Sequence, residues 1–243
     1  MDLFALPPLA HLLDLATRAL LALTALLDPL AGPAAAALAV VVVTLMVRLA
    51  LIPVGVSQAR AEQSRARLAP RLRALRERWG HSPERLQRET MHLYRDEGAS
   101  PLAGCAPVLA QAPVVGLLYA VFLHPTVDGH TNELLAHELF GVPLGRSLAG
   151  ALSTGTMDAA TLAVIGTLVA VIAFAAEMTR RVLRPPVDPA APTWTAGLVG
   201  VLQFTTAAVA AFVPVAAGLY LAVTTVWTVA QRRLLRRRYP LPS

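Results

Sequence analysis

The feature that most constrains this chain is an apolar run from residue 34 to residue 56, which contains a single charged side chain, Arg48. A helix over these 23 residues would rise about 34 Å, against about 30 Å for the hydrocarbon core of a bilayer. An arginine at the centre of a membrane helix costs roughly 2.5–3.5 kcal/mol unless water or polar groups receive it. Arg48 therefore either faces a polar cavity or snorkels along its own helix to the membrane surface.

Long apolar runs recur through the rest of the chain. Its 243 residues are 56% hydrophobic with a mean hydropathy of +0.57, which is typical of helical proteins that cross the membrane several times. The sequence therefore predicts an all-α polytopic membrane protein, in which residues 1–243 form one domain with five transmembrane helices. The predicted spans cover residues 34–56, 101–124, 159–177, 193–211 and 212–230.

The segment before the first span has a mixed character. Residues 6–31 carry leucines at helical spacing, but His11, Asp14, Arg18 and Asp28 interrupt the apolar surface. This pattern favours an N-terminal amphipathic helix that lies in the membrane interface. A sixth transmembrane helix is the alternative.

The segment after the first span is strongly charged. Residues 57–99 hold ten arginines and six acidic residues, and their few large apolar side chains repeat with 4-3-4 spacing from Leu68 to Trp79. That spacing predicts one packed helix, and residues 80–83 carry the Gly, Ser and Pro that end it and start a second one. We therefore expect a cytoplasmic helical hairpin. A solvated linker is the alternative.

The arginines predict the orientation in the membrane. All 21 basic residues are arginine; ten, three and five of them follow the first, third and fifth spans. Only Arg18 and Arg146 fall on the opposite side, and Arg146 lies in a predicted irregular extracytoplasmic loop at residues 125–158. Because basic residues stay in the cytoplasm, we predict a bacterial cytoplasmic membrane protein with its N-terminus outside and the basic tail at residues 231–243 in the cytoplasm. The first two residues lack the basic region of a secretory signal, so no cleavage is expected there.

Several function classes are disfavoured. An ion-coupled transporter normally carries a carboxylate within its spans, whereas here only Glu177 touches one, at its edge. His137-Glu138 has no second histidine at metal-site spacing, and no phosphate-binding glycine loop is present. The single cysteine, Cys105, offers neither a disulfide nor a metal cluster. We therefore expect no catalytic residues, no metal and no cofactor, and no nucleic acid as a specific ligand.

Three motifs follow one another along the chain, and each combines a few polar residues with prolines or glycines. They consist of Arg48 with Pro53; of Tyr94, Gly104, Cys105, Pro107, Gln111 and Pro113; and of Pro214, Gly218, Tyr220, Trp227 and Gln231. In this order they resemble the motifs of the YidC-type membrane protein insertases (the YidC/Oxa/Alb family), whose relatives serve mitochondria and chloroplasts. Ser100 and Leu221 depart from the usual pattern, in which asparagine and an aromatic residue are common.

The resemblance implies a polar groove that opens to the cytoplasm and to the lipid, with Arg48 as its central charge. Hydrophilic tails of nascent membrane proteins would cross through the groove, and their transmembrane segments would move out into the lipid bilayer. The implied partners are nascent membrane proteins and the bilayer, with the ribosome and a Sec translocon as further candidates. An assembly factor without insertase activity of its own is the main alternative, and a small-solute transporter is a weaker one.

Polar residues within the spans are the candidate groove residues. Thr44 shares a helix face with Arg48, and Gln111 lies near the middle of the second span. On the fifth span Tyr220, Thr224, Trp227 and Gln231 form one stripe at i, i+4, i+7 and i+11, although ordinary packing and an interfacial Trp also explain such a stripe. Gln203 and Thr206 on the fourth span are weaker candidates, which could simply form hydrogen bonds between helices. The motif residues expected to act structurally are Pro53, Gly104, Cys105, Pro107, Pro113, Pro214 and Gly218.

Overall fold

Helices make up nearly all of the regular structure. The structure is a computed structural model that describes residues 7–98, 106–124, 126–127, 130–182, 201 and 204–240. Its α-helices are α1 (Pro7–Ala31), α2 (Ala35–Ala50), α3 (Ile52–Trp79), α4 (Pro83–Asp96), α5 (Ala106–Leu123), α6 (Leu148–Thr154), α7 (Ala159–Val182), α9 (Thr205–Phe212) and α10 (Val215–Arg238). This content fits the predicted all-α class.

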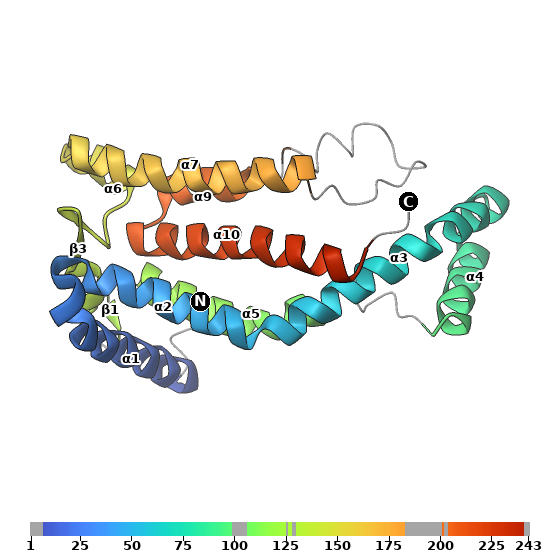
Figure 1. Cartoon of the computed structure of the whole chain (residues 1–243), viewed down its shortest axis with the longest axis horizontal. Helices are drawn as coiled ribbons and strands as arrows, with labels where there is room; N and C mark the ends of the chain where they lie inside the picture. The colour runs from blue at the N-terminus through green and yellow to red at the C-terminus, as the bar shows by residue number, and fades with distance from the viewer. Residues whose placement is uncertain are drawn as a thin grey trace.

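Helix α10 is the centre of the bundle. It packs against α2, α3, α5, α7 and α9, and Figure 1 shows it between α7 and α9 on one side and α2 and α5 on the other. Its buried residues all lie in its N-terminal half, and most of them are small. Where Gly218 faces α7, a Cβ atom would stand 3.3 Å from Leu168 Cδ1. Small residues at such contacts let membrane helices approach closely.

The two ends of the bundle differ in charge and in structure. Helices α3 and α4 and the C-terminal ends of α7 and α10 lie at one end, and the turn between α1 and α2, the short strands and α6 lie at the other (Figure 1). Most of the arginines belong to the first group of elements. The uneven distribution of arginine along the sequence is therefore also uneven in space. We call the two ends the arginine end and the loop end.

The first predicted span, residues 34–56, consists of two helices instead of one. Helix α2 ends at Ala50, and α3 begins at Ile52 and continues without a break into the hairpin. Pro53 explains the break at Leu51, because it has no N–H for the carbonyl of Leu49 and its ring crowds the preceding turn. The first arm of the hairpin thus starts inside the predicted span instead of at residue 57. Helix α3 packs against α4 on the other side of the turn at residues 80–82.

The segment at residues 125–158 is more ordered than the irregular loop predicted from the sequence. Strand β1 (Thr126–Val127) pairs with β2 (His130–Thr131), and β3 (Glu138–Leu139) pairs with β4 (Val142–Pro143), with the 3₁₀ helix η4 (Glu133–Ala136) between the two pairs. Leu134, Val142 and Leu144 are fully buried. The backbone N–H groups of Val215 and Ala216 donate to the carbonyls of Arg146 and Leu144. These bonds join the segment to the start of α10.

The last two predicted spans meet at a tight turn, as expected from their short connection. Helix α9 ends at Phe212 and α10 starts at Val215, with Pro214 as its N-cap residue. Helix α10 then runs to Arg238 and includes most of the predicted basic tail, because arginine is a good helix former and no breaker precedes Pro240. Residues 101–105, 193–200 and 202–203 of the predicted spans lie outside the described residues.

Two segments of the described chain are long and apolar enough to cross a membrane, His11–Ala50 and Ala159–Arg181. Both fit a membrane location. The first contains α1, which packs against α2 and α5 and also against β1 and η4 at the loop end. These contacts suit either a helix in the interface or an additional span, so the amphipathic assignment of residues 6–31 stays a prediction.

Candidate functional site around Arg48

Arg48 lies in the last turn of α2, half-buried against α10. The carbonyl end of a helix carries partial negative charge, which favours a cation by about 0.3–1 kcal/mol. Its guanidinium also interacts electrostatically with the side chain of Tyr220 on α10. Within the residues that the structure describes, it makes no hydrogen bond and no ion pair. The charge is thus partly removed from water, and its donors are unused among the described residues.

Tyr220 connects Arg48 to an aromatic cluster. Its side chain is only 3% exposed, and its ring lies 6.1 Å from that of Phe122 and 6.4 Å from that of Tyr119, both on α5. These centroid distances are in the range of favourable aromatic pairs. The sequence analysis did not single out Tyr119 and Phe122. Their i, i+3 spacing in an otherwise aliphatic helix was the available signal.

Thr44 is buried one turn before Arg48, but its hydroxyl proton is already in use. Its Oγ1 donates to the carbonyl of Val40 at 2.6 Å. Such a bond inside a helix satisfies a polar side chain in an apolar setting. Thr44 therefore has only its oxygen lone pairs left to offer to a neighbour.

The predicted stripe on α10 divides into two pairs. Next to Tyr220, the Oγ1 of Thr224 lies close enough to interact with the tyrosine hydroxyl but forms no hydrogen bond of good geometry. Further along, Trp227 Nε1 donates to Gln231 Oε1 at 3.0 Å. The structure thus brings Arg48 and Tyr220 together, while Trp227 and Gln231 bind each other nearer the arginine end.

Gln231 packs against the backbone of α3. A Cβ atom placed on Gly55 would stand 2.1 Å from Gln231 Nε2, so only glycine allows this close approach. That Nε2 atom is buried and has no hydrogen-bond partner among the described residues. The contact joins the end of α10 to the first turns of α3.

Three further contacts connect the same two segments. We call this contact region, between residues 55–63 of α3 and residues 231–240, the root junction. Both Nε and Nη2 of Arg60 donate to the Tyr239 hydroxyl, at 3.4 and 3.2 Å, and the guanidinium lies 5.5 Å from that ring's centroid. This hydrogen bonding lowers the pKa of Tyr239. The root junction is completed by Gln63 Nε2, which donates to the carbonyl of Pro240 at 3.0 Å, and by an ion pair of Arg236 with Glu62 at 3.5 Å.

The remaining predicted site residues divide into those that are placed and those that are not. Pro53 lies in the first turn of α3, Pro107 and Pro113 lie on α5, and Pro214 and Gly218 lie at the start of α10. Gly104, Cys105, Gln203 and the side chain of Gln111 lie outside the described part of the chain. The groove roles of Gln111 and Gln203 and the structural roles of the other residues stay predictions.

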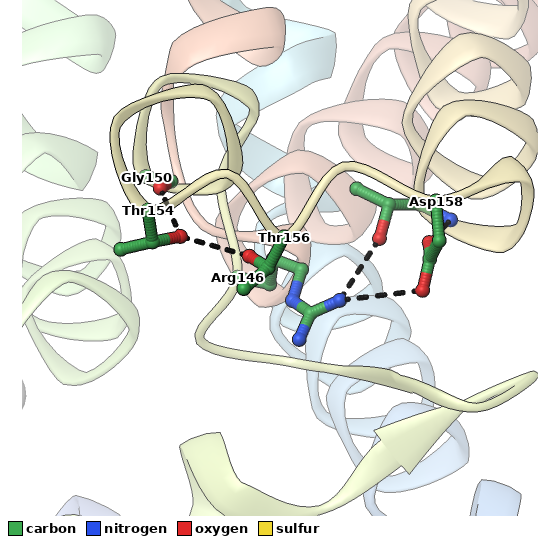
Figure 2. A network of polar contacts seen from close by, with 6 residues as sticks. Arg146, Gly150, Thr154, Thr156 and Asp158 are labelled. Carbon is green, nitrogen blue, oxygen red and sulfur yellow. Dashed lines mark hydrogen bonds and ion pairs between the residues drawn. The ribbon is translucent and has the colours of Figure 1, made fainter.

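At the loop end, Arg146 joins the segment before α6 to α7. Its Nη1 donates to Thr161 Oγ1 at 3.1 Å. The same atom faces Asp158 Oδ2 at 3.6 Å, and Figure 2 shows Arg146 and Asp158 side by side. Asp158 also accepts from the backbone N–H of Thr161 at 2.7 Å. Hydrogen bonds from Thr161, assisted by the charge of Arg146, hold the pKa of Asp158 below its usual range. In the described part of the chain, no group of three or more His, Cys, Asp or Glu side chains could hold a metal ion.

Comparison with known proteins identifies the family. The family model described as "60Kd inner membrane protein" matches residues 27–241, which include Arg48, the aromatic cluster and the root junction. This chain belongs to the 60Kd inner membrane protein family. The resemblance to YidC-type insertases inferred from the motifs is thereby confirmed.

Several relatives of this family are named as insertases. The chain is 29% identical over 224 residues to the membrane protein insertase YidC of Streptomyces avermitilis, covering 85% of this chain and 52% of the relative. It is 32% identical over 117 residues to the membrane protein insertase YidC of Clostridium perfringens, covering 48% and 49%. It is 29% identical over 199 residues to the inner membrane ALBINO3-like protein 1 of Chlamydomonas reinhardtii, covering 74% and 39%. The chain thus spans about half the length, or less, of these relatives.

Proposed function

We propose that this chain is a membrane protein insertase in which Arg48 attracts the hydrophilic tail of a nascent membrane protein. The observation that carries the proposal is the arginine itself. It lies on α2 half-buried against α10, it interacts with the Tyr220 side chain, and its donors are unused among the described residues. A structural arginine inside a bundle is normally paired. An unpaired one is suited to a transient anionic partner.

The size of the attraction follows from the surroundings. At an effective dielectric constant of about 20, unit charges roughly 6 Å apart attract by about 2.8 kcal/mol, about four times more than in water. That gain offsets part of the cost of bringing an acidic tail to membrane depth. The apolar segment of the same substrate then moves into lipid, driven by its own transfer free energy. Neither step requires a nucleotide or an ion.

The proposed location is a bacterial cytoplasmic membrane, with the N-terminus outside and the arginine end in the cytoplasm. The gathering of α3, α4 and the basic ends of α7 and α10 at one end of the bundle supports this orientation (Figure 1). The hairpin of α3 and α4 would then stand where nascent proteins arrive, and we propose that it captures them. Delivery by the ribosome and cooperation with a Sec translocon are part of the same proposal.

Reconstitution in liposomes tests the function. The purified protein would be given two single-span substrates that differ only in an acidic or a neutral outside-facing tail. We expect the wild type to insert both substrates without any other component. The insertion yield of an Arg48→Leu variant should be at least ten-fold below that of the wild type for the acidic tail, and should fall less for the neutral tail. Arg48→Lys should retain part of the activity, because a passing carboxylate needs a cation more than a planar fork.

The control is Arg18→Leu, which removes another arginine, one that forms an exposed ion pair with Asp14. It should leave both yields unchanged, and the thermal midpoint should show that every variant is folded. Equal yields for Arg48→Leu and the wild type on both substrates would refute the role of the charge. Insertion that occurs only with added components would instead favour an assembly factor.

A further inference from the structure

The hairpin of β3 and β4 carries an aromatic residue in an unfavourable backbone conformation. Phe140 and Gly141 connect the two strands and have φ angles of 53° and 79°. A two-residue hairpin turn of this kind needs positive φ at both positions, and asparagine, aspartate or glycine normally provides it. Phenylalanine rarely adopts this conformation. The turn itself gives no reason for an aromatic residue here.

The packing of the hairpin gives no reason either. The Phe140 side chain is 82% exposed, whereas Val142 and Leu144 just beyond it are fully buried. Backbone bonds fix the base of the hairpin, with Leu144 N–H donating to His137 and Gly145 N–H to Leu135, both at 2.8 Å. The fold therefore holds Phe140 firmly and presents it outward.

Other large apolar side chains are exposed on elements at the same end of the molecule. Strand β3 packs against the 3₁₀ helix η2 (Gly32–Ala34), which follows the end of α1. Leu30 in the last turn of α1 is 83% exposed. The other members are Leu152 on α6, Leu162 at the start of α7 and Phe212 at the end of α9. We call these five residues the apolar rim. Two of its members, Leu30 and Leu162, themselves belong to the two segments able to cross a membrane.

We propose that the apolar rim lies at the boundary between headgroups and acyl chains of the outer leaflet, and that Phe140 inserts there as the anchor of the β3–β4 hairpin. Aromatic rings favour this zone of the bilayer. Continuity of the rim with the membrane-crossing segments favours lipid over a protein partner. The charges narrow the choice of lipid, because the exposed acids Glu133 and Glu138 beside the hairpin offer nothing to an anionic headgroup. The anchor is therefore apolar and not electrostatic. It rests on the membrane orientation proposed above, but not on the role of Arg48.

Spin labelling measures the depth of the anchor directly. In a Cys105→Ser background, a nitroxide would be attached at Phe140→Cys and, as a control, at Thr154→Cys, an exposed position on α6. In vesicles of phosphatidylcholine, the label at 140 should collide more with oxygen and less with a water-soluble nickel chelate than the label at 154. Adding phosphatidylglycerol or salt should leave that difference unchanged. Equal nickel accessibility at the two positions, or a depth that follows the anionic lipid fraction, would overturn the proposal.

A second pair of variants separates anchoring from folding. Asparagine suits the left-handed turn, so Phe140→Asn should keep or raise the thermal midpoint in detergent. In vesicles it should expose the hairpin, and cleavage after Glu138 by a glutamate-specific protease should become several-fold faster. Phe140→Leu keeps an apolar side chain and should be cleaved at the wild-type rate. If Phe140→Asn is also cleaved at the wild-type rate, Phe140 is not an anchor.

Discussion

Replacing Gly55 with alanine tests the packing of the root junction. The new Cβ would stand 2.1 Å from Nε2, 2.9 Å from Cδ and 3.3 Å from Oε1 of Gln231. All three atoms belong to the end of a flexible side chain, so the amide must rotate away while the helices stay in place. In doing so it gives up the hydrogen bond from Trp227 Nε1.

Two contributions of opposite sign then nearly cancel. Alanine in place of glycine stabilises a helix by about 0.8–1.0 kcal/mol. The lost hydrogen bond costs about 0.5–1.5 kcal/mol. We therefore expect Gly55→Ala to change the free energy of unfolding by less than about 1 kcal/mol, which for a chain of this size is about 2–4 °C in the thermal midpoint. In a Gln231→Ala background the new Cβ has no amide to displace. Gly55→Ala should then stabilise the protein by the full gain in helix propensity.

The assay is a double-mutant cycle from denaturant titrations in detergent micelles. The coupling between Gly55→Ala and Gln231→Ala should be about 1 kcal/mol. Gly166→Ala on α7 is the control, because an added Cβ there meets no atom within 4 Å and should act alike in both backgrounds. Additivity of Gly55→Ala and Gln231→Ala within about 0.3–0.5 kcal/mol would show that the two residues are not in contact.

Three further predictions concern the loop end and the orientation. Asn132→Ala should destabilise by about 1–3 kcal/mol, since its Nδ2 serves two carbonyls at the end of α5, at 2.8 and 3.1 Å; Asn132→Asp should not rescue stability in a denaturant titration, because a carboxylate cannot donate. Because the pKa of Asp158 is lowered from its ordinary value of 3.8, the ionised carboxylate stabilises the fold above that pH. The thermal midpoint of the wild type should therefore fall relative to that of Asp158→Asn only when the pH drops below about 4. A difference between the two midpoints that stays constant down to pH 2 would contradict this. Single cysteines at Thr154 and Gln87, in a Cys105→Ser background, should react with an impermeant reagent from opposite sides of the membrane. Reaction of both from the same side would contradict the proposed topology.

The helices of this fold were predictable from the sequence where long apolar runs occur. The positions at which one helix ends and the next begins were harder to predict. Pro53 was recognised as part of a motif but not as the start of a new helix, because the apolar run continues unchanged on both sides of it. The order in residues 130–154 was missed for a different reason. Its strands are two residues long, too short for an alternating pattern, and its stability comes from a few buried leucines and from bonds to α10.

The candidate site was predictable only for residues that share a helix. Helical spacing grouped Tyr220, Thr224, Trp227 and Gln231 in one stripe on α10, and within that stripe the structure joins Trp227 to Gln231 by a hydrogen bond. No local pattern could show that Tyr119 approaches Tyr220 from another helix. The contact of Arg60 with Tyr239 is harder still, because 179 positions separate the two residues and neither is apolar. Such long-range polar contacts require the fold to be known.

The position of α10 determines how movement of the hairpin can reach Arg48. From Val215 to Gln231 this helix rises about 24 Å, and it carries the bonds to the loop end, the Tyr220 side chain and the contact with Gly55 along one rigid axis. Shifting the first turns of α3 would therefore either break the contacts of the root junction or displace all of α10, and the second choice also breaks the backbone bonds of Val215 and Ala216. Both choices cost more than a movement of the hairpin beyond the root junction. If the hairpin moves in the proposed capture of substrates, its movement should therefore be confined to the chain beyond Gln63, and the surroundings of Arg48 should stay unchanged.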